Sequence, residues 1–278
     1  PATDIISVAV DMGENFLNNV VDATQYAFSK AAIMGKPCVI NASIGTYSGS
    51  HDGYDLAAQM IDNLVSQQTG RSFVCAAGNA GNIPFHLGYE AQQDSAFTWL
   101  TYNGAISEVA YEWWIDKSEA SNFNFSIGAD ASSPVEFLGR TPYYNLLTSF
   151  NFSSGSDIIK DTLWNGATRI GTITLIAYEF DSAYSCDVII HPDVTSYYWR
   201  FITNGSGRFD LWSGAAVTGT SDIVSSNLPS SLDFPDITRY HLPNTEQTIV
   251  SSFTCSDKVI TVANYINRTQ YIDYYADL

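Results

Sequence analysis

Apolar residues follow two different spacings in the first 80 positions. Short continuous runs of β-branched and small apolar residues are typical of strands buried on both faces. These runs are Ile5–Val10, Cys38–Ala42 and Ser72–Ala77. Between the runs, residues 18–33 and 55–67 carry apolar side chains at three- and four-residue steps, which predicts two amphipathic helices. Alternation of strand and helix in this order predicts a parallel sheet with helices packed on it.

The pattern changes at about residue 83. Short aromatic and β-branched runs, separated by Gly, Ser, Asn and Pro, continue from there to about residue 255 and predict an all-β sandwich with a jelly-roll-like arrangement. The clearest runs are Glu108–Ile115, Asn122–Ile127, Thr172–Tyr178, Asp187–Ile190, Tyr197–Ile202 and Gly207–Trp212. The sequence Asn-Gly-Ser-Gly at 204–207 predicts a hairpin turn between the last two.

A buried-strand pattern returns near the end of the sequence, at Lys258–Ala263. We therefore predict one α/β domain, residues 1–82 and 256–278, that is interrupted by a β-sandwich insert at residues 83–255. No apolar run reaches about 18 residues, the length that a membrane-spanning helix requires.

Composition narrows the functional classes. The 29 acidic residues outnumber the 12 basic ones, and a net charge of −17 argues against nucleic-acid binding, which needs a basic surface. The chain holds 17 Tyr, 15 Phe and 6 Trp. These rings have two interpretations, as filling for the sandwich core or as a face that binds sugar or peptide, and core filling is the favoured one.

The four cysteines form no CxxC pair, which argues against zinc-binding and thioredoxin-like functions. Cys38 and Cys75 lie within apolar runs and are expected to be buried free thiols. A disulfide between Cys186 and Cys255 is left open, because spacing alone does not determine connectivity.

Four segments resemble the subtilisin-like serine protease (subtilase) family, and they occur in the family's order. They are Pro1–Ile6, Val39–Gly45 (VINASIG), Phe73–Gly81 (FVCAAGNAG) and Val259–Tyr265 (VITVANY). The resemblance covers residues 1–82 and 256–278, and the long insert is similar to that of clostridial and Bacteroidetes-type subtilases. It implies an incomplete subtilisin-like α/β domain that is interrupted by the β-sandwich.

The resemblance also implies roles for individual residues. Ser43, Ile44 and Gly45 would form an exposed strand edge to which an extended peptide can add as a further strand. The pocket for the residue before the scissile bond would be lined by Ala76, Ala77 and Gly78. Asn79 matches the family's oxyanion-hole asparagine.

The family's catalytic Asp, His and Ser would all lie outside residues 1–278. Asp11, in Asp-Met-Gly, resembles the aspartate motif, but no histidine motif follows it, so we interpret it as a loop cap. Ser221, in Gly-Thr-Ser, is followed by Asp222 rather than by Met-Ala, and we interpret it as a turn residue. His51 follows the substrate strand, and we interpret it as a structural residue or as part of the groove rim.

The sequence therefore predicts a fragment of a serine endopeptidase, inactive by itself, from a secreted, periplasmic or cell-surface parent that cleaves peptide or protein substrates. Two alternatives remain, a pseudoprotease and a binding module whose insert binds glycan or protein. No cofactor is implied. Asp11, Glu14 and Asn15 supply oxygen atoms for calcium but form no recognisable loop motif. A truncated sheet exposes its edges, so we expect these edges to be covered by the insert or by self-association of the fragment.

Overall fold

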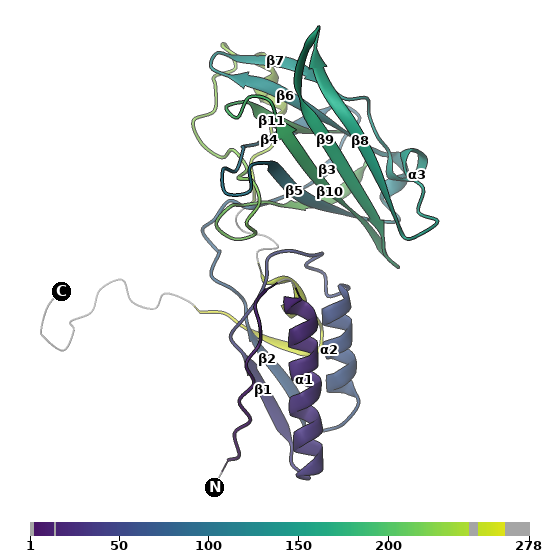
Figure 1. Ribbon diagram of the computed structural model, residues 1–278, viewed down its shortest axis with the longest axis vertical. Coiled ribbons are helices and arrows are strands. Elements are labelled where there is room, and N and C mark those ends of the chain that lie inside the picture. The colour runs from purple at the N-terminus through teal and green to yellow at the C-terminus, as the bar shows by residue number, and fades with distance from the viewer. Residues whose placement is uncertain (1–2, 14, 245–249, 265–278) are drawn as a thin grey trace, which may run out of the picture. The chain divides into compact units, whose positions relative to one another are not determined.

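The chain folds into two compact units, which we describe separately. The structure, a computed structural model, describes residues 3–13, 15–244 and 250–264 (Figure 1). One unit contains residues 1–45, 51–79 and 250–278, and the other contains 46–50 and 80–249. The protein is a mixed α/β protein. It has a small parallel sheet with helices and two antiparallel sheets.

The first unit is a three-stranded parallel sheet with helices on one face. Its strands are β1 (Cys38–Ala42), β2 (Arg71–Ala76) and β13 (Val259–Val262), in the order β1-β2-β13. Its helices are α1 (Phe16–Ile33) and α2 (Leu56–Ser66), with a short 3₁₀ helix at Ser252–Thr254. Asp55 caps α2, because its Oδ1 accepts from the Ala58 N–H at 2.9 Å. The helices and three of the predicted strands thus form within a residue or two of the predicted bounds.

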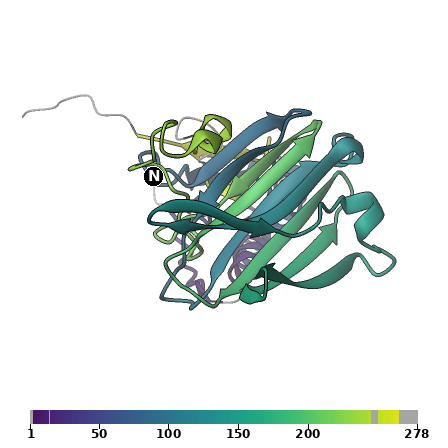
Figure 2. The same ribbon diagram turned by 90° about the horizontal axis from the view of Figure 1, so that it is seen from above.

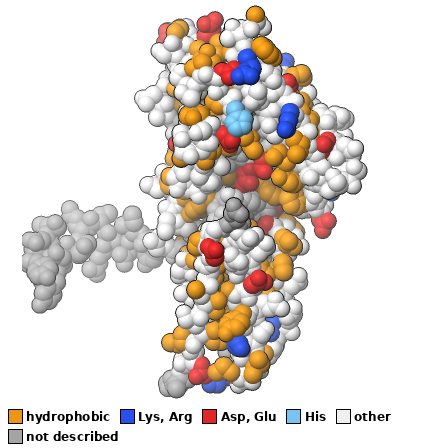
Figure 3. Space-filling model, viewed as in Figure 1, with side chains coloured by type: hydrophobic (Ala, Val, Ile, Leu, Met, Phe, Trp, Pro, Cys, Tyr) orange, Lys and Arg blue, Asp and Glu red, His pale blue; other side chains and the backbone are white. Residues whose placement is uncertain are grey.

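The core of this unit lies between the helices and one face of the sheet. Phe28, Ala58, Ile61 and Phe73 are each at most 1% exposed. On the opposite face, Val39 is 70% exposed, and Ile260 and Val262 are each more than half exposed. Hydrophobic side chains are also visible on the face of this unit that Figure 3 shows. A parallel sheet is usually covered on both faces, so these residues are the physical basis for the expected self-association.

Residues 5–10 were predicted to be a buried strand, and this prediction is wrong for the described structure. The segment is extended but pairs with no strand, and Ile5 is 89% exposed. Ile6 and Val10 are partly buried near α1. A continuous apolar run favours a strand, but a strand forms only where a neighbouring edge accepts its hydrogen bonds.

The second unit consists of two antiparallel sheets on a shared core (Figure 2). The six-stranded sheet has the order β3-β12-β5-β10-β9-β8, and the four-stranded sheet has the order β4-β11-β6-β7. Strands β3 to β7 are His86–Ala91, Ala96–Leu100, Val109–Asp116, Phe123–Ser132 and Val135–Arg140. Strands β8 to β12 are Ser156–Asn165, Thr168–Glu179, Ala183–Pro192, Tyr198–Gly205 and Gly207–Trp212. Three short helices, at Ala120–Asn122, Leu146–Ser149 (α3) and Pro235–Arg239, complete the unit.

Aromatic rings from both sheets fill the space between them. Trp113 of β5 packs edge-on against Phe125 of β6, with ring centroids 4.8 Å apart, and it also contacts Phe201 of β11. All three side chains are fully buried. Edge-to-face aromatic pairs contribute beyond the area that they bury, so this cluster joins the two sheets. The finer jelly-roll assignment stays a prediction.

The turn at 204–207 does not close a hairpin, contrary to the sequence prediction. Strand β11 pairs with β4 and β6, whereas β12 pairs with β3 and β5, so the turn carries the chain from one sheet to the other. Gly205 has φ +93°, and a Cβ there would lie 1.8 Å from the Asn122 carbonyl oxygen. The turn signal was correct, but it does not reveal whether the flanking strands are partners.

Replacement of Gly205 by alanine should therefore unfold or strongly destabilise the insert, because the backbone of Asn122 has to move. The matched control is Gly155→Ala. Gly155 also has a positive φ, +83°, but a Cβ there meets nothing within 4 Å. We expect the control to cost about 1–2 kcal/mol, the penalty of a left-handed backbone alone. Urea unfolding followed by tryptophan fluorescence measures both, and equal losses would contradict this explanation.

Candidate functional site

The predicted site residues gather at one edge of the parallel sheet. Ala42 of β1 is in register with Cys75 of β2, so the residues that follow the two strands leave the sheet together. Beyond β2, the Ala77 N–H donates to the Val262 carbonyl of β13 at 2.9 Å. The segments Ser43–Gly45 and Ala76–Asn79 therefore share the carboxyl edge of the sheet, the edge at which open α/β sheets place their ligands.

Asn79 is exposed on the loop that directly follows β2. The preceding residue, Gly78, has φ +107°, a conformation that favours glycine. The next residue, Ala80, is buried at 2% exposure. Asn79 is thus an exposed residue in a turn that directly follows a strand of the sheet.

The predicted substrate edge is only partly open. Ser43 is exposed and Ile44 is partly buried, and the Ile44 carbonyl accepts from the Cys75 thiol, with sulfur and oxygen 3.3 Å apart. Burial raises the pKa of Cys75 to about 11, so the thiol stays protonated and remains a donor at neutral pH. A Cβ on Gly45 would lie 2.3 Å from Ser251 Oγ. The absence of a side chain at position 45 is therefore required by Ser251.

Ser251 is a site residue that the sequence analysis missed. Its N–H donates to the Ala77 carbonyl at 2.9 Å, next to the predicted specificity pocket. The surrounding sequence, Ser-Ser-Phe, matches no motif, and only the long-range pairing reveals the residue.

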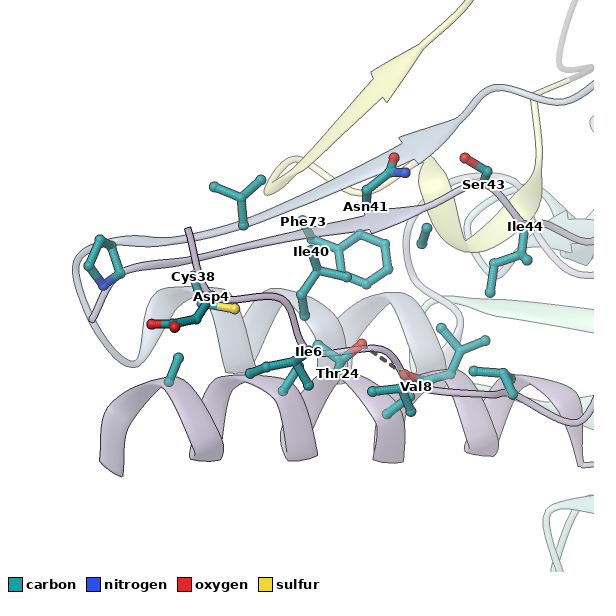
Figure 4. Close-up of a pocket in the computed structure, with 18 of the residues that line it drawn as sticks. Asp4, Ile6, Val8, Thr24, Cys38, Ile40, Asn41, Ser43, Ile44 and Phe73 are labelled. Atoms are coloured by element: carbon teal, nitrogen blue, oxygen red, sulfur yellow. Dashed lines mark hydrogen bonds between the residues drawn. The ribbon is translucent and has the colours of Figure 1, made fainter. Parts of the chain in front are cut away.

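A groove of about 790 Å³ runs along the outer edge of β1. Ser43 and Ile44 line it, whereas Gly45, Ala76, Ala77, Gly78 and Asn79 do not. Figure 4 shows its other wall, where Asp4, Ile6 and Val8 of the extended N-terminal segment lie opposite β1. Alternate residues of that segment face the groove, as they do in a strand. The groove therefore extends away from Asn79 and does not contain the whole predicted site.

His51 lies in a structural position and not on an exposed rim. It is 6% exposed, and its Nδ1 is 2.5 Å from the Val250 carbonyl oxygen. Its φ of +53° is unusual for a residue other than glycine. The groove-rim interpretation is therefore wrong, because the ring is buried against the segment that returns from the insert.

The two residues that resemble triad members have structural contacts. Asp11 Oδ1 accepts from the Gly13 N–H at 3.0 Å, which is the predicted loop cap. Ser221 is fully buried, and its Oγ accepts from the Ala110 N–H at 3.0 Å. Of the calcium candidates, Glu14 lies outside the described residues, and the described part of the chain contains no cluster of three metal-binding side chains.

The aromatic residues of the insert mostly form its core. Four tryptophans, namely Trp99, Trp113, Trp199 and Trp212, are at most 1% exposed. Trp164 is 53% exposed, and Trp114 is partly buried. A sugar-binding face needs several exposed coplanar rings, so the tryptophans support the structural interpretation.

All four cysteines are free thiols. Cys75 and Cys186 are buried as expected of apolar positions, and Cys38 and Cys255 are partly exposed. The open alternative of a Cys186–Cys255 disulfide is not realised, and the predicted burial of Cys38 is incomplete because its strand is at the edge of the sheet.

A parallel sheet whose carboxyl edge carries an Ala-Ala-Gly-Asn turn beside an open strand end defines a peptidase-like α/β unit. The family model described as the Subtilase family matches residues 1–167, and the chain belongs to this family. The match covers the motifs at Val39–Gly45 and Phe73–Gly81 and continues into the insert. The Pro1–Ile6 motif begins, and the Val259–Tyr265 motif ends, outside the described residues.

Among solved structures, the chain is similar to the CspB protease of Clostridium perfringens, with a TM-score of 0.62 and 19% sequence identity. The alignment covers 90% of this chain and 47% of that protein, so the chain spans about half the length of its structural relative. This likeness supports the fold of both units. No curated protein matches the chain. Within the described residues, no helix is long and apolar enough to cross a membrane.

Proposed function

We propose that the chain is part of a serine endopeptidase and supplies the substrate strand, the specificity pocket and the oxyanion-hole asparagine. The observation that carries this proposal is the position of Asn79, exposed at the carboxyl edge of the sheet beside Ser43–Gly45. Family membership supports the peptidase chemistry. The substrates are peptides or proteins, and they add to the strand edge in extended conformation.

The chemistry assigned to Asn79 follows from its side chain. In acyl transfer, a nucleophile converts the scissile carbonyl into a tetrahedral intermediate whose oxygen carries negative charge. A carboxamide N–H that is fixed before the reaction stabilises this charge more than it stabilises the neutral carbonyl, and it therefore lowers the barrier. Asn79 has a donor of this type, in the turn that follows Gly78.

The catalytic Asp, His and Ser are proposed to be supplied by parts of the protein outside residues 1–278. Asp11 and Ser221 support this, because both are engaged in structural hydrogen bonds. Ser221 is also inaccessible to substrate. An oxyanion donor without a nucleophile and a base accelerates nothing, so residues 1–278 by themselves should be inactive.

A fluorophosphonate probe tests this assignment, because it labels only a serine that is activated as a nucleophile. The longer protein should be labelled, and a chain of residues 1–278 should remain unlabelled under the same conditions. Labelling of the shorter chain would contradict the placement of the triad. A longer protein that binds substrate peptides but takes up no label would instead be a pseudoprotease.

A further inference from the structure

The loop of residues 46–50 belongs to the unit of the insert, although residues 51–79 separate it from the rest of that unit in sequence. It directly continues the predicted substrate residues Ser43–Gly45. The Tyr47 hydroxyl accepts from the Ala80 N–H at 3.0 Å. The Tyr47 ring also packs edge-on against the Phe85 ring, with the two ring centroids 5.1 Å apart. Since Ala80 follows Asn79 directly, the loop is tied to both segments of the proposed site.

The second attachment of the loop is a carboxylate on the insert. The Gly49 N–H donates to Glu112 Oε1 at 2.7 Å. Glu112 is in β5, where its neighbours Tyr111 and Trp113 are buried in the sandwich core. Because side chains alternate along a strand, Glu112 points to the opposite face of the sheet, where the loop lies. Gly49 has φ +114°, so this hydrogen bond also depends on a backbone that favours glycine.

Glu112 is partly buried among few charges. Asp187 of the adjacent strand β10 is directly opposite, and Trp212 of β12 is opposite on the other side. The same face and the loop also carry the charged or titratable side chains of Asp210, Arg208, His86, Glu90, Tyr178, Asp116, Lys160 and Tyr47. Burial raises the pKa of Glu112 to about 7, the Gly49 N–H opposes this rise, and the Asp187 carboxylate adds to it.

We propose that Glu112 is a positioning residue for substrate, whose ionised carboxylate holds the 46–50 loop and thereby the end of the substrate strand. The proposal rests on the proposed function of Ser43–Gly45. A hydrogen bond from an N–H to a carboxylate is about twice as strong as one to a neutral acceptor. The loop is therefore held more firmly when Glu112 is ionised than when it is protonated.

The two effects of Glu112 on the fold have opposite signs. Folding raises the pKa of Glu112 from 4.5 in the unfolded chain to about 7. Its contribution to the free energy of unfolding is therefore fully present below about pH 4.5 and is lost as the pH rises through about 7. The Gly49 hydrogen bond, in contrast, strengthens over the same interval. A loop that becomes better protected while the whole unit becomes less stable is a signature that simple structural packing does not produce.

Amide hydrogen exchange, measured by NMR on residues 1–278, tests the attachment. The protection factor of the Gly49 N–H should rise roughly tenfold as the pH increases through about 7, and Glu112→Gln should abolish the rise. The matched variant Asp187→Asn removes the negative charge that lies directly across from Glu112, so the midpoint of the rise in Gly49 protection should move to lower pH. A flat profile in the unaltered protein would overturn the proposal.

The substrate role requires the longer peptidase. Glu112→Gln should raise KM for an extended peptide roughly three- to tenfold above about pH 7 and leave kcat within about twofold, because a looser strand end weakens ground-state binding. An unchanged KM would overturn the proposal even if Gly49 protection titrates. An unaltered longer protein that neither cleaves nor binds peptides would refute the proposed function instead, and with it the substrate role of the loop.

Discussion

Replacement of Asn79 by alanine should lower kcat of the complete peptidase roughly 10²–10³-fold and change KM little. This magnitude is the one known for the oxyanion-hole asparagine of subtilisin, a protease of the same family as this chain. The physical reason is that the carboxamide donates to an oxygen that becomes charged only as the nucleophile attacks. Steady-state kinetics with a peptide substrate measures both constants.

The matched control for Asn79→Ala is Asn63→Ala, a change at another exposed asparagine in the same unit. Asn63 lies within α2, where alanine is well tolerated. Both variants should fold, because both side chains are exposed. A higher KM with unchanged kcat in Asn79→Ala would show that Asn79 binds the ground state, and the oxyanion assignment would then be wrong.

A large loss of stability should also come from Asp130→Ala in the insert. Asp130 and Arg200 are an almost fully buried ion pair, with Arg200 Nη2 and Asp130 Oδ1 2.7 Å apart. The Trp99 indole N–H also donates to Asp130, at 2.7 Å. Removal of the carboxylate leaves a buried guanidinium with Asp236, at 3.4 Å, as its remaining carboxylate partner in the described structure. We expect a loss of about 3–5 kcal/mol in the free energy of unfolding.

The matched control for Asp130→Ala is Asp193→Ala, in the same insert. Asp193 makes a similar two-bond contact with Arg169, but the two side chains are 32% and 52% exposed to solvent. Water screens such a pair and replaces its hydrogen bonds. Asp193→Ala should therefore lower the free energy of unfolding much less than Asp130→Ala does. Urea unfolding followed by the fluorescence of the buried tryptophans compares the two. Similar losses would mean that Asp130 has another partner or that the insert relaxes around Arg200.

The fold of the α/β unit was largely predictable because its signals are local. Helical spacing and the apolar strand runs placed α1, α2, β1, β2 and β13 correctly. The Ile5–Val10 run had the same local signal and failed, since a strand also requires a partner edge. In the insert, β3, β4, β7 and β8 were not among the predicted runs. In β7 and β8, many exposed and polar positions weaken the apolar alternation.

Residues of the proposed site could be predicted where they belong to a sequence motif. Residues that reach the site only through long-range contacts could not. The Ala-Ala-Gly-Asn motif located Asn79, and the positive φ of Gly78 explains why glycine precedes it. Ser251 and Glu112 had no such signal. Their roles arise from hydrogen bonds between residues that are far apart in sequence, and only the fold brings those residues together.

The most direct test is a structure of the complete protein with a peptide boronate or aldehyde that forms a tetrahedral adduct. We predict that the oxygen of the adduct lies about 2.7–3.1 Å from Asn79 Nδ2, the distance of an oxyanion hydrogen bond. We also predict that the peptide pairs with Ser43–Gly45 and that the bonded serine is outside residues 1–278. An adduct oxygen that contacts other donors, with the Asn79 carboxamide turned away, would contradict the oxyanion role of Asn79.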